Sequence, residues 1–412
     1  MMRTEIYFAG GCFWGTEHYF KQLEGVLETQ AGYANGDIPS PTYQQVYTDT
    51  TGFAECVKVT YNSEIIPLET LCRMYFRSID PLILNRQGND CGTRYRTGIY
   101  WTKESDKEIV EKIYSEIESL YKTPLAVEKL PLKNFYPAEE YHQEYLVKNP
   151  QGYCHLSFET LMMAKNYTSV INELRKYSDH QKKTVLQRFF KTAPGEYGEG
   201  DKFLGVTNPN IRKVAKQFSE LSWETLEALI ESQWHEVRLC TLFIAIIKYK
   251  KEPQKGLQFY LSHLKWVNNW DLVDLSAPNL LGQYLIEQKE RQILTSLIEV
   301  NNLWYKRIAI VATLPLIKKG EFETTLTLAE KLLTTKEDLL QKAAGWMLRE
   351  IGKKDIDTLL EFLDKNVSRM PGTMLRYSIE KLPESQRQEY LTRKKRDKLP
   401  KKNQTLTQIV KK

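Results

Sequence analysis

The sequence predicts two domains of different class, an α/β domain followed by an all-α domain of stacked helix pairs. In residues 1–160, strand-like runs such as EIYFAGG alternate with helix-like runs such as CFWGTEHYFKQL. From residue 178 onward the strand signals vanish, and helices of ten to sixteen residues follow one another with short breaks. The chain has 412 residues, of which 42% are hydrophobic and 27% charged, so it can build ordinary cores for two or three domains.

The domain boundaries follow changes in composition. We expect the α/β domain over residues 1–160, a linker over 161–177, the helical domain over 178–392 and a basic tail over 393–412. The tail holds nine Lys and Arg against one acidic residue, and we expect it to be disordered because it is too polar to fold alone.

The two halves carry opposite charge. Residues 1–160 hold 15 Lys and Arg against 22 Asp and Glu, a net charge of −7, and the remaining residues hold 43 against 30, a net charge of +13. We therefore expect the halves to have different partners.

Composition also restricts the location and the metal content of the chain. No run approaches the ~18 uncharged apolar residues of a membrane span, and the N-terminus MMRTEIYFAGG enters a strand-like pattern without the body of a signal peptide. We expect a cytoplasmic protein without membrane contact. The six cysteines are too few for a disulfide scaffold, and none has a zinc-site spacing, so no structural metal is expected.

A weak repeat runs through the helical half. One position at the start of an apolar helix recurs in steps of 36, 33, 35 and 34 residues, and it is occupied by Arg238, Asp274, Arg307, Lys342 and Arg376. This period is typical of stacked helix pairs, and the absence of tetratricopeptide marks favours a HEAT-like array. Cations repeated in this way can line a concave surface, although single charges more often cap helices or pair with a neighbouring turn.

Cys12 is the first candidate for chemistry. It lies in the segment GGCFWG, residues 10–15, between an apolar strand and an amphipathic helix. At a helix N-terminus we expect its thiol pKa to be lowered by unpaired amides and the helix dipole, which makes the sulfur a nucleophile. Phe13 and Trp14 can wall an apolar slot beside it. On this segment alone, a buried structural thiol is an equally good interpretation.

Four segments resemble, in order and spacing, the A-type peptide methionine sulfoxide reductases. They are GGCFWG at 10–15, TGFAE at 51–55, GNDCGTRYR at 88–96, and YHQEYL through GYC at 141–154. The resemblance covers roughly residues 4–155. It implies a thiol-dependent reductase that acts on (S)-methionine sulfoxide, free or in peptides and proteins, and that needs no bound cofactor.

The resemblance also implies a role for each matching residue. Cys12 attacks the sulfoxide sulfur, and Glu55 donates a proton to the oxygen, which requires that burial raise the pKa of the carboxyl. The matching substrate-binding residues are Tyr43 and Tyr95 at the sulfoxide oxygen, the buried Asp90 that organises these phenols, and Phe13 and Trp14 around the methyl group.

A second thiol must then condense with the sulfenic acid on Cys12. Cys154 matches the resolving cysteine of the family, whose usual reductant is the dithiol of thioredoxin. The family commonly has His where this chain has Phe53, and many members have a further cysteine where this chain has HLSFETLMMAKN. We therefore predict a two-thiol cycle and expect the remaining thiols of this half to be packed: Cys56, Cys72 and Cys91.

Tryptophan and arginine recur in the helical half. The pairs Trp304/Arg307 and Trp346/Arg349 have the three-residue spacing that places both side chains on one helix face, although core packing is the alternative for each tryptophan alone. The segments FLGV at 203–206, NWDLVD at 269–274, LWYKR at 303–307 and KAAGWMLRE at 342–350 resemble the AlkD-type DNA alkylation repair glycosylases, over roughly residues 178–392.

That second resemblance implies a HEAT-like array whose basic concave face holds damaged duplex DNA. An acid then stabilises the cationic sugar that forms as an N3- or N7-alkylated purine leaves. The matching residues are Asp274 as this acid, Trp270 and Trp346 beside the lesion, Arg307 near the phosphates, and Arg349 next to Trp346. Two alternatives stay open, a non-catalytic DNA-binding module and a protein-binding scaffold that delivers oxidised peptides.

Overall fold

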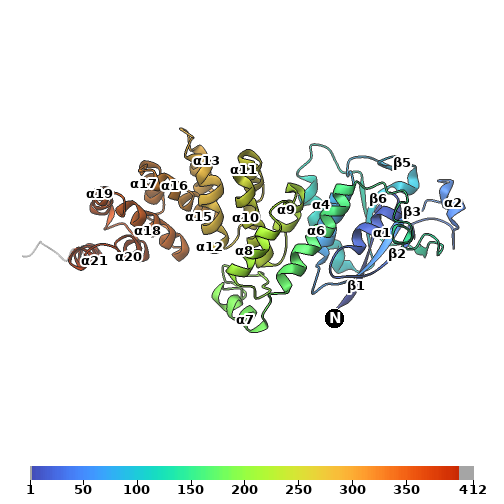
Figure 1. The fold of residues 1–412 in the computed structure, drawn as a ribbon, viewed down its shortest axis with the longest axis horizontal. Helices are drawn as coiled ribbons and strands as arrows, with labels where there is room; N and C mark the ends of the chain where they lie inside the picture. Colours follow the sequence, from blue (N-terminus) through green and yellow to red (C-terminus); the bar gives the residue numbers. More distant parts are fainter. Residues whose placement is uncertain (1, 399–412) are drawn as a thin grey trace, which may run out of the picture. The chain divides into compact units, whose positions relative to one another are not determined.

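The structure is a computed structural model that describes residues 2–398, and these residues form two compact units (Figure 1). Unit 1 is an α/β unit and unit 2 is helical, so the predicted fold class is confirmed. Unit 1 contains Met1–Asp179, Leu204–Asn210 and Glu220–Val237. Unit 2 contains His180–Phe203, Ile211–Ser219 and the described residues from Arg238 onward.

Unit 1 is built on a mixed sheet. In the described part of the chain, its strands are β1 (Arg3–Gly10), β2 (Val26–Ala34), β3 (Ala54–Asn62), β6 (Thr97–Trp101), β7 (Val127–Pro131) and β8 (Phe135–Pro137). The strand order is β7-β6-β1-β3-β2-β8, and all neighbours are antiparallel except β6 and β7. A separate two-stranded sheet joins β4 (Arg86–Gln87) and β5 (Asp90–Cys91).

Helices pack on this sheet, and their packing determines where the first helix begins. Unit 1 contains α1 (Phe13–Lys21), α2 (Tyr43–Tyr47), α3 (Leu68–Ser78), the 3₁₀ turn η1 (Thr93–Tyr95), α4 (Glu104–Glu118), α5 (Tyr145–Lys148), α6 (Phe158–Arg175) and α9 (Trp223–Ile230). Phe8 of β1 stacks on Phe20 of α1 at 4.5 Å and on Tyr75 of α3 at 5.1 Å. Because α1 follows β1 directly, this packing positions Cys12 at the turn between them.

The structure differs from the predicted linker over residues 161–177. Most of these residues lie in α6, which begins where Ser157 accepts the backbone N–H of Thr160 and which has a buried apolar face. Helix α6 packs against α1, α3 and α9, and Arg175 near its end forms an ion pair with Glu24 at 2.8 Å. Apolar residues at helical spacing therefore belong to the core of unit 1, and the segment is not a connection.

Unit 2 consists of helices, and two helices have residues in both units, α8 (Asn208–Gln217) and α10 (His235–Tyr249). The other described helices are α7 (His180–Phe189), α11 (Pro253–Ser262), η2 (Leu264–Trp266), α12 (Trp270–Ala277), the π-helix η3 (Pro278–Gly282), α13 (Gln283–Leu285), α14 (Gln292–Glu299), α15 (Leu303–Val311), α16 (Leu314–Lys318), α17 (Glu323–Lys331), α18 (Asp338–Gly352), α19 (Ile356–Asn366), α20 (Gly372–Ser378) and α21 (Glu384–Lys398). Helix α12 packs on α15, α15 on α18 and α18 on α20. The HEAT-like repeat stays a prediction.

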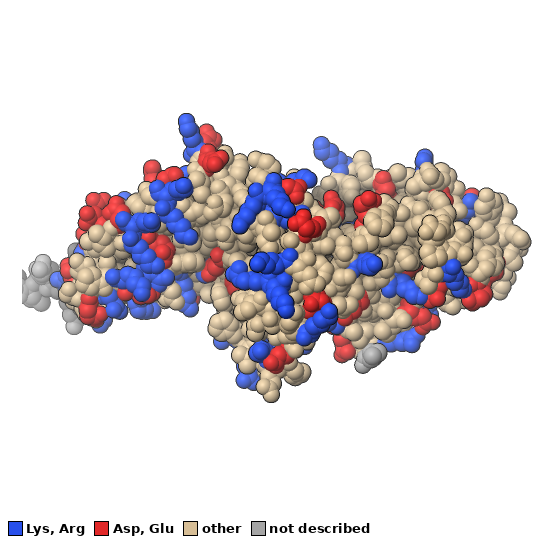
Figure 2. All heavy atoms as spheres, in the orientation of Figure 1, with Lys and Arg blue, Asp and Glu red and all other residues tan. Residues whose placement is uncertain are grey.

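The repeated charged position does not form an open row of cations. Arg238 is 2% exposed and forms an ion pair with Asp201, and Arg307 forms one with Asp274 at 2.8 Å. Lys342 pairs with a residue of its own helix. Most of these charges form ion pairs with neighbouring segments. This outcome agrees with the interpretation of paired charges and not with that of a cation-lined surface. On the face drawn in Figure 2, Lys and Arg gather over the helices of unit 2 with Asp and Glu between them.

The basic tail and the membrane prediction can be compared with the structure only in part. Residues 393–398 continue helix α21, so the expected disorder does not hold for them, and residues 399–412 lie outside the described residues. Within residues 2–398, no helix is both long enough and apolar enough to cross a membrane.

Candidate functional site

Cys12 is the N-cap of α1, which is the position that the sequence predicts. The preceding Gly11 has φ +83°, a backbone conformation that glycine adopts without strain and that turns the chain from β1 into the helix. Cys12 is 5% exposed, and its side chain makes no capping hydrogen bond, although the nearby backbone N–H groups of Trp14 and Gly15 act to lower the pKa of the thiol.

The pKa of Cys12 is shifted in the direction opposite to the prediction. Burial is the largest cause and raises the thiol pKa well above its usual value, and the charges of Glu55 and Asp90 raise it further. The N–H groups at the helix start lower this pKa, but desolvation outweighs them because a thiolate loses its hydration in the buried site. The resting thiol is therefore protonated, and its proton must leave as the sulfur attacks.

Glu55 lies against the same helix start. It belongs to β3, is 1% exposed, and its Oε2 accepts the backbone N–H of Phe13 at 3.0 Å. Burial raises the pKa of Glu55 to about 8, although the Phe13 N–H and the charge of Arg94 act to lower it. The predicted rise is confirmed, and at pH 7 the carboxyl group holds the proton that a general acid must donate.

The two predicted phenols lie near Glu55. Tyr43 begins α2 and Tyr95 ends η1. Burial, followed by the charge of Glu55, raises the pKa of Tyr43 to about 12, and the same two causes raise the pKa of Tyr95 as well. Both hydroxyl groups therefore keep their protons at neutral pH and can donate hydrogen bonds to a sulfoxide oxygen.

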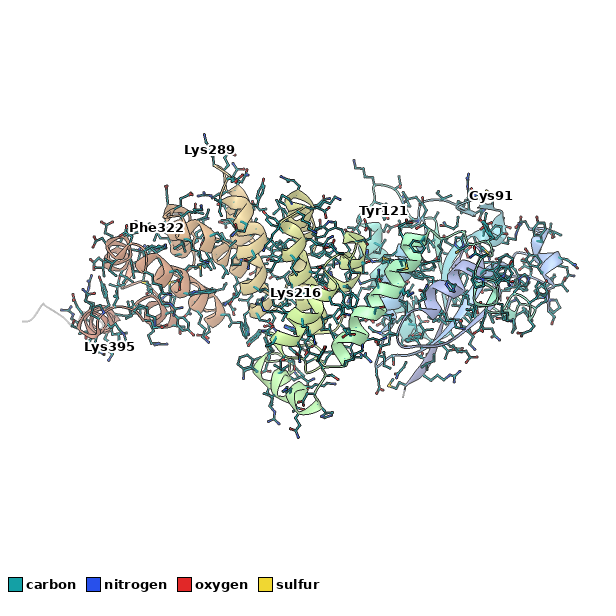
Figure 3. The ribbon with its side chains drawn as sticks, in the orientation of Figure 1. Cys91, Tyr121, Lys216, Lys289, Phe322 and Lys395 are labelled. Carbon is teal, nitrogen blue, oxygen red and sulfur yellow. The ribbon has the colours of Figure 1, made fainter. Side chains whose placement is uncertain are left out.

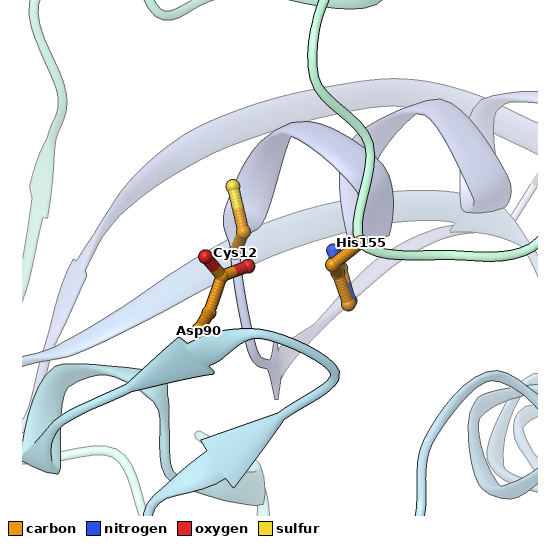
Figure 4. Close-up of side chains that lie close together, drawn as sticks. All are labelled: Cys12, Asp90 and His155. Carbon is orange, nitrogen blue, oxygen red and sulfur yellow. The ribbon is translucent and has the colours of Figure 1, made fainter.

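Asp90 lies beside Cys12 (Figure 4). A carboxylate oxygen of Asp90, the sulfur of Cys12 and a ring nitrogen of His155 are all within 4.8 Å of one another. Asp90 is only partly buried and also interacts with the hydroxyl of Tyr153. Its role in organising the two phenols stays a prediction.

Aromatic rings pack around the start of α1. Phe13 is buried with its ring 4.9 Å from that of His142. The indole N–H of Trp14 donates to Nδ1 of His142 at 3.1 Å, and the Trp14 ring stacks on Tyr145 at 3.8 Å. A pocket for the substrate methyl group between Phe13 and Trp14 stays a prediction.

The sequence analysis missed two residues of this region. His142 is buried, and burial lowers its pKa. Glu139 accepts the backbone N–H of Tyr43 and the hydroxyl of Tyr33, each at 2.8 Å, so it ties α2 to β2. The signal for His142 was its place in the matching segment YHQEYL. Glu139 lies two residues before that segment and has no comparable signal.

Cys154 and His155 approach the first turn of α1. Cys154 is half-buried, and both it and Cys12 are free thiols. A Cβ atom at Gly15 would lie 3.2 Å from the sulfur of Cys154 and 2.7 Å from Nδ1 of His155. The Nε2 atom of His155 is 2.9 Å from the carbonyl oxygen of Gly10. The absence of a side chain at position 15 is thus what lets the predicted resolving cysteine approach the helix that carries Cys12.

Gly15→Ala is expected to slow closure of a disulfide between Cys12 and Cys154 by about tenfold or more, because the methyl group would displace residues 154 and 155. The first reduction, which needs only Cys12 and the donor groups, is expected to change less. Quenched-flow measurement of methionine release and of free thiols separates the two steps. Equal rates of disulfide closure in the variant and the unmodified chain would contradict this expectation.

The other cysteines of unit 1 differ in burial. Cys56 and Cys72 have no exposed surface, as predicted. Cys91 is exposed (Figure 3), and the prediction of a packed thiol is wrong for it. It lies on the short strand β5, which pairs with β4 away from the main sheet, so no core surrounds it.

Unit 2 contains a cavity of about 480 Å³ that brings the predicted DNA-site residues together. The lining includes the five predicted residues, which are Trp270, Asp274, Arg307, Trp346 and Arg349. The other lining residues are Phe189, Tyr197, Leu339, Lys342 and Tyr377. Phe189, Tyr197 and Tyr377 were not singled out from the sequence, because nothing in a single sequence distinguishes them from core aromatic residues.

Asp274 and Arg307 form a bidentate ion pair. The Nε and Nη2 atoms of Arg307 donate to the two carboxylate oxygens of Asp274 at 2.9 and 2.8 Å. Burial raises the pKa of Asp274, and Arg307 acts against this rise. The remaining nitrogen of Arg307, Nη1, donates to the carbonyl oxygen of Leu339. With all three nitrogens engaged and 5% exposure, Arg307 holds Asp274 in place. Its predicted position near the phosphates stays a prediction.

The tryptophans of this cavity are also held by neighbours. The ring of Trp270 stacks on Phe190 at 5.2 Å. The indole N–H of Trp346 donates to Glu350 at 3.1 Å, and Arg349 forms an ion pair with Glu380. Trp270 and Trp346 thus present their rings to one cavity together with Asp274. Their contact with a lesion stays a prediction.

Comparisons with known proteins assign a family to each part. The family model for peptide methionine sulfoxide reductase matches residues 4–174, and that for DNA alkylation repair enzymes matches residues 170–382. Peptide methionine sulfoxide reductase MsrA of Clostridium acetobutylicum is 51% identical over 157 residues, which are 38% of this chain and 97% of the relative.

Two solved structures are also similar. Mxr1 from Saccharomyces cerevisiae in its reduced form is 41% identical, with a TM-score of 0.36, over 38% of this chain and 91% of that one. A predicted DNA alkylation repair enzyme from Enterococcus faecalis is 19% identical, with a TM-score of 0.43, over 50% of this chain and 97% of that one. By the family models and the curated relative, the chain belongs to the peptide methionine sulfoxide reductases through its N-terminal part and to the DNA alkylation repair enzymes through its C-terminal part.

Proposed function

We propose that unit 1 reduces (S)-methionine sulfoxide, free or in proteins, with Cys12 as the nucleophile. The observation that carries this proposal is the pairing of Cys12 with Glu55 at one helix start. Cys12 is the residue before the first turn of the helix, and the carboxyl group bonded to the next N–H has a pKa of about 8 and is therefore protonated at neutral pH.

The chemistry requires both groups. The sulfur of Cys12 attacks the sulfoxide sulfur while a proton passes from Glu55 to the oxygen, because an unprotonated oxygen is a poor leaving group. The proton of the Cys12 thiol replaces the one that Glu55 gave up. The doubly protonated oxygen leaves as water, and a water molecule then attacks the Cys12 sulfur, returns one proton to Glu55 and releases the thioether. One water is formed and one is consumed, and Cys12 is left as a sulfenic acid. Tyr43 and Tyr95 stabilise the oxygen by hydrogen bonding during this step.

We infer that Cys154 resolves the sulfenic acid. Its thiol displaces the hydroxyl group as water and forms a disulfide with Cys12. A dithiol of the thioredoxin type then reduces the disulfide by thiol exchange and is itself oxidised. The approach of Cys154 to Gly15 supports this order of steps.

Cys154→Ser is expected to release one methionine per chain and then to stop turnover with thioredoxin, because no second thiol can form the exchangeable disulfide. Methionine release over time, with thioredoxin and its reductase as the only reductants, measures both phases. Continued turnover at the unmodified rate would remove Cys154 from the mechanism without affecting the role of Cys12. Cys91→Ser, which changes an exposed thiol of the same unit, is the matched control.

We propose that unit 2 binds DNA and excises alkylated purines. The cavity that joins Asp274 to Trp270 and Trp346 supports this proposal, together with the membership of this part in the DNA alkylation repair enzymes. A carboxylate at the edge of a shallow aromatic cavity can stabilise the cationic sugar while the damaged base departs. Arg307 fixes the orientation of that carboxylate.

Asp274→Asn is expected to lower release of 7-methylguanine from duplex DNA by about 10²-fold or more, since the amide cannot stabilise positive charge on the sugar. Abasic sites that form during incubation with the full chain are the readout. DNA affinity measured on unmodified duplex is expected to stay within about threefold. Equal rates of base release in the two chains would contradict a catalytic role for Asp274.

A non-catalytic DNA-binding module is the second candidate for unit 2. It is favoured by one observation, that both carboxylate oxygens of Asp274 are already bonded to Arg307. This module would bind DNA with an affinity that falls steeply with salt, because neutralised phosphates release counterions, and it would release no base. A scaffold for oxidised peptides would instead bind peptide without DNA affinity.

A further inference from the structure

Three side chains of metal-ligand type, one of them Cys12, converge at the start of α1. The Cys12 sulfur, a carboxylate oxygen of Asp90 and a ring nitrogen of His155 lie within 4.8 Å of one another (Figure 4). They come from three different segments: the start of α1, the strand β5 and the segment that follows Cys154. Among the described residues this is the one His/Cys/Asp/Glu group with such spacing.

Two atoms of this group are buried and have no hydrogen-bond partner among the described residues. They are Oδ2 of Asp90 and Nδ1 of His155. A buried polar atom without a partner costs about 1–3 kcal/mol, so native proteins rarely leave two of them together. Both atoms are electron-pair donors, and a cation between them would satisfy both.

The orientation of His155 favours metal binding. Its Nε2 lies 2.9 Å from the carbonyl oxygen of Gly10, so Nε2–H is the donor and the lone pair is on Nδ1. Histidines that bind metals usually donate their other ring N–H in this way, often to a backbone carbonyl. Nδ1 faces the first helical turn, because a Cβ atom at Gly15 would lie 2.7 Å from it.

We propose that the reduced chain binds one Zn²⁺ ion through Cys12 Sγ, an Asp90 carboxylate oxygen and His155 Nδ1, with water in the fourth position. Cysteine, histidine and aspartate are the usual ligands of zinc, at about 2.0–2.3 Å, and three protein ligands with an open fourth position form a known type of site. Ligand atoms around tetrahedral zinc are about 3.3–3.7 Å apart. Side-chain rotations that move the ligand atoms by about 1 Å would therefore bring them to the spacing of zinc ligands.

Binding releases one proton and blocks the nucleophile. The Cys12 thiol loses its proton to solvent as the sulfur–zinc bond forms, and no oxidant or reductant takes part. The bound sulfur donates charge to zinc and is a weaker nucleophile, and the ion occupies space beside it, so zinc holds the thiol in a reversible, protected state that a chelator releases. This consequence for turnover rests on the proposed reductase function, whereas the binding itself rests only on the ligand geometry.

The test is zinc binding to the full chain under reducing, dithiol-free conditions, measured by competition with a chromophoric chelator. One equivalent of tightly bound Zn²⁺ is expected. Asp90→Asn and His155→Asn are each expected to weaken binding by at least about tenfold, because the first removes the charge of the carboxylate ligand and the second removes the imidazole nitrogen. Co²⁺ in place of Zn²⁺ is expected to give a thiolate-to-metal charge-transfer band that disappears in Cys12→Ser.

Cys91→Ser is the matched control, because Cys91 is an exposed thiol next to Asp90 in the sequence, and its loss is expected to leave zinc affinity unchanged. Zinc binding that persists in Asp90→Asn and His155→Asn but vanishes in Cys91→Ser would overturn the proposal. So would the absence of bound zinc in a chain that reduces methionine sulfoxide, a result that leaves the reductase function intact. Zinc binding by a chain without reductase activity would refute the proposed function alone.

Discussion

Cys12→Ser is expected to lower sulfoxide reduction by at least about 10⁴-fold, because the hydroxyl group of serine is a far weaker nucleophile than the sulfur and cannot form a sulfenic acid. The measurement is kcat/KM for a chromophoric methionine (S)-sulfoxide with dithiothreitol as reductant. The binding groups around the site stay in place, so substrate affinity is expected to change little.

Two controls separate chemistry from folding. Cys91→Ser removes an exposed thiol and is expected to leave kcat/KM unchanged. The urea-induced unfolding transition of Cys12→Ser is expected to stay close to that of the unmodified chain, because the two side chains have similar size. Residual turnover of Cys12→Ser above about 1% of the original rate would contradict a nucleophilic role for Cys12.

Glu55→Gln is expected to lower kcat by about 10²- to 10⁴-fold, because the amide cannot donate the proton that the sulfoxide oxygen needs. The carboxyl group must be protonated to act, and its pKa is about 8. The rate of the unmodified chain should therefore fall as the pH rises above about 8, and this limb of the pH profile should be absent in the variant. If the rate of Glu55→Gln also fell above about pH 8, this fall in rate would have to come from the titration of another group.

The same pKa shift makes a prediction about stability. In the unfolded chain the carboxyl group of Glu55 loses its proton near its usual pKa of 4.5, whereas in the folded chain it keeps the proton up to about 8. The folded state binds more protons between these values, so its stability falls as the pH rises through this range. Glu55→Gln removes this loss and is expected to raise the free energy of unfolding at pH 7.5 by about 1–3 kcal/mol.

Part of the fold and the site could be predicted from the sequence because it depends on local pattern. Strand-like runs followed by amphipathic runs predicted a mixed α/β unit, and the GGCFWG segment predicted Cys12 at the start of a helix. The raised pKa of Glu55 was also expected, because the resemblance implies a proton donor at this position and burial is what raises the pKa of a carboxyl group.

Other features of the fold and the site depend on tertiary contacts, which a local sequence pattern does not predict. The amides at the helix start do favour a thiolate at Cys12, but burial outweighs them, and burial is a property of the assembled site. Arg307 matched a phosphate-binding position, yet its partner Asp274 is 33 residues away in the sequence. Helix α6 has apolar residues at helical spacing, but their packing on unit 1 is a tertiary contact, so the segment was predicted to be a linker.

The oxidation of Cys12 to a sulfenic acid by the substrate is the central claim, and one measurement tests it most directly. The Cys154→Ser variant is mixed with one equivalent of methionine (S)-sulfoxide without reductant, treated with a sulfenic-acid reagent, digested and examined by mass spectrometry. We predict that the peptide containing Cys12 carries the reagent, in an amount equal to the methionine released. Methionine release with an unlabelled Cys12 peptide, or with the label on another cysteine, would contradict the account.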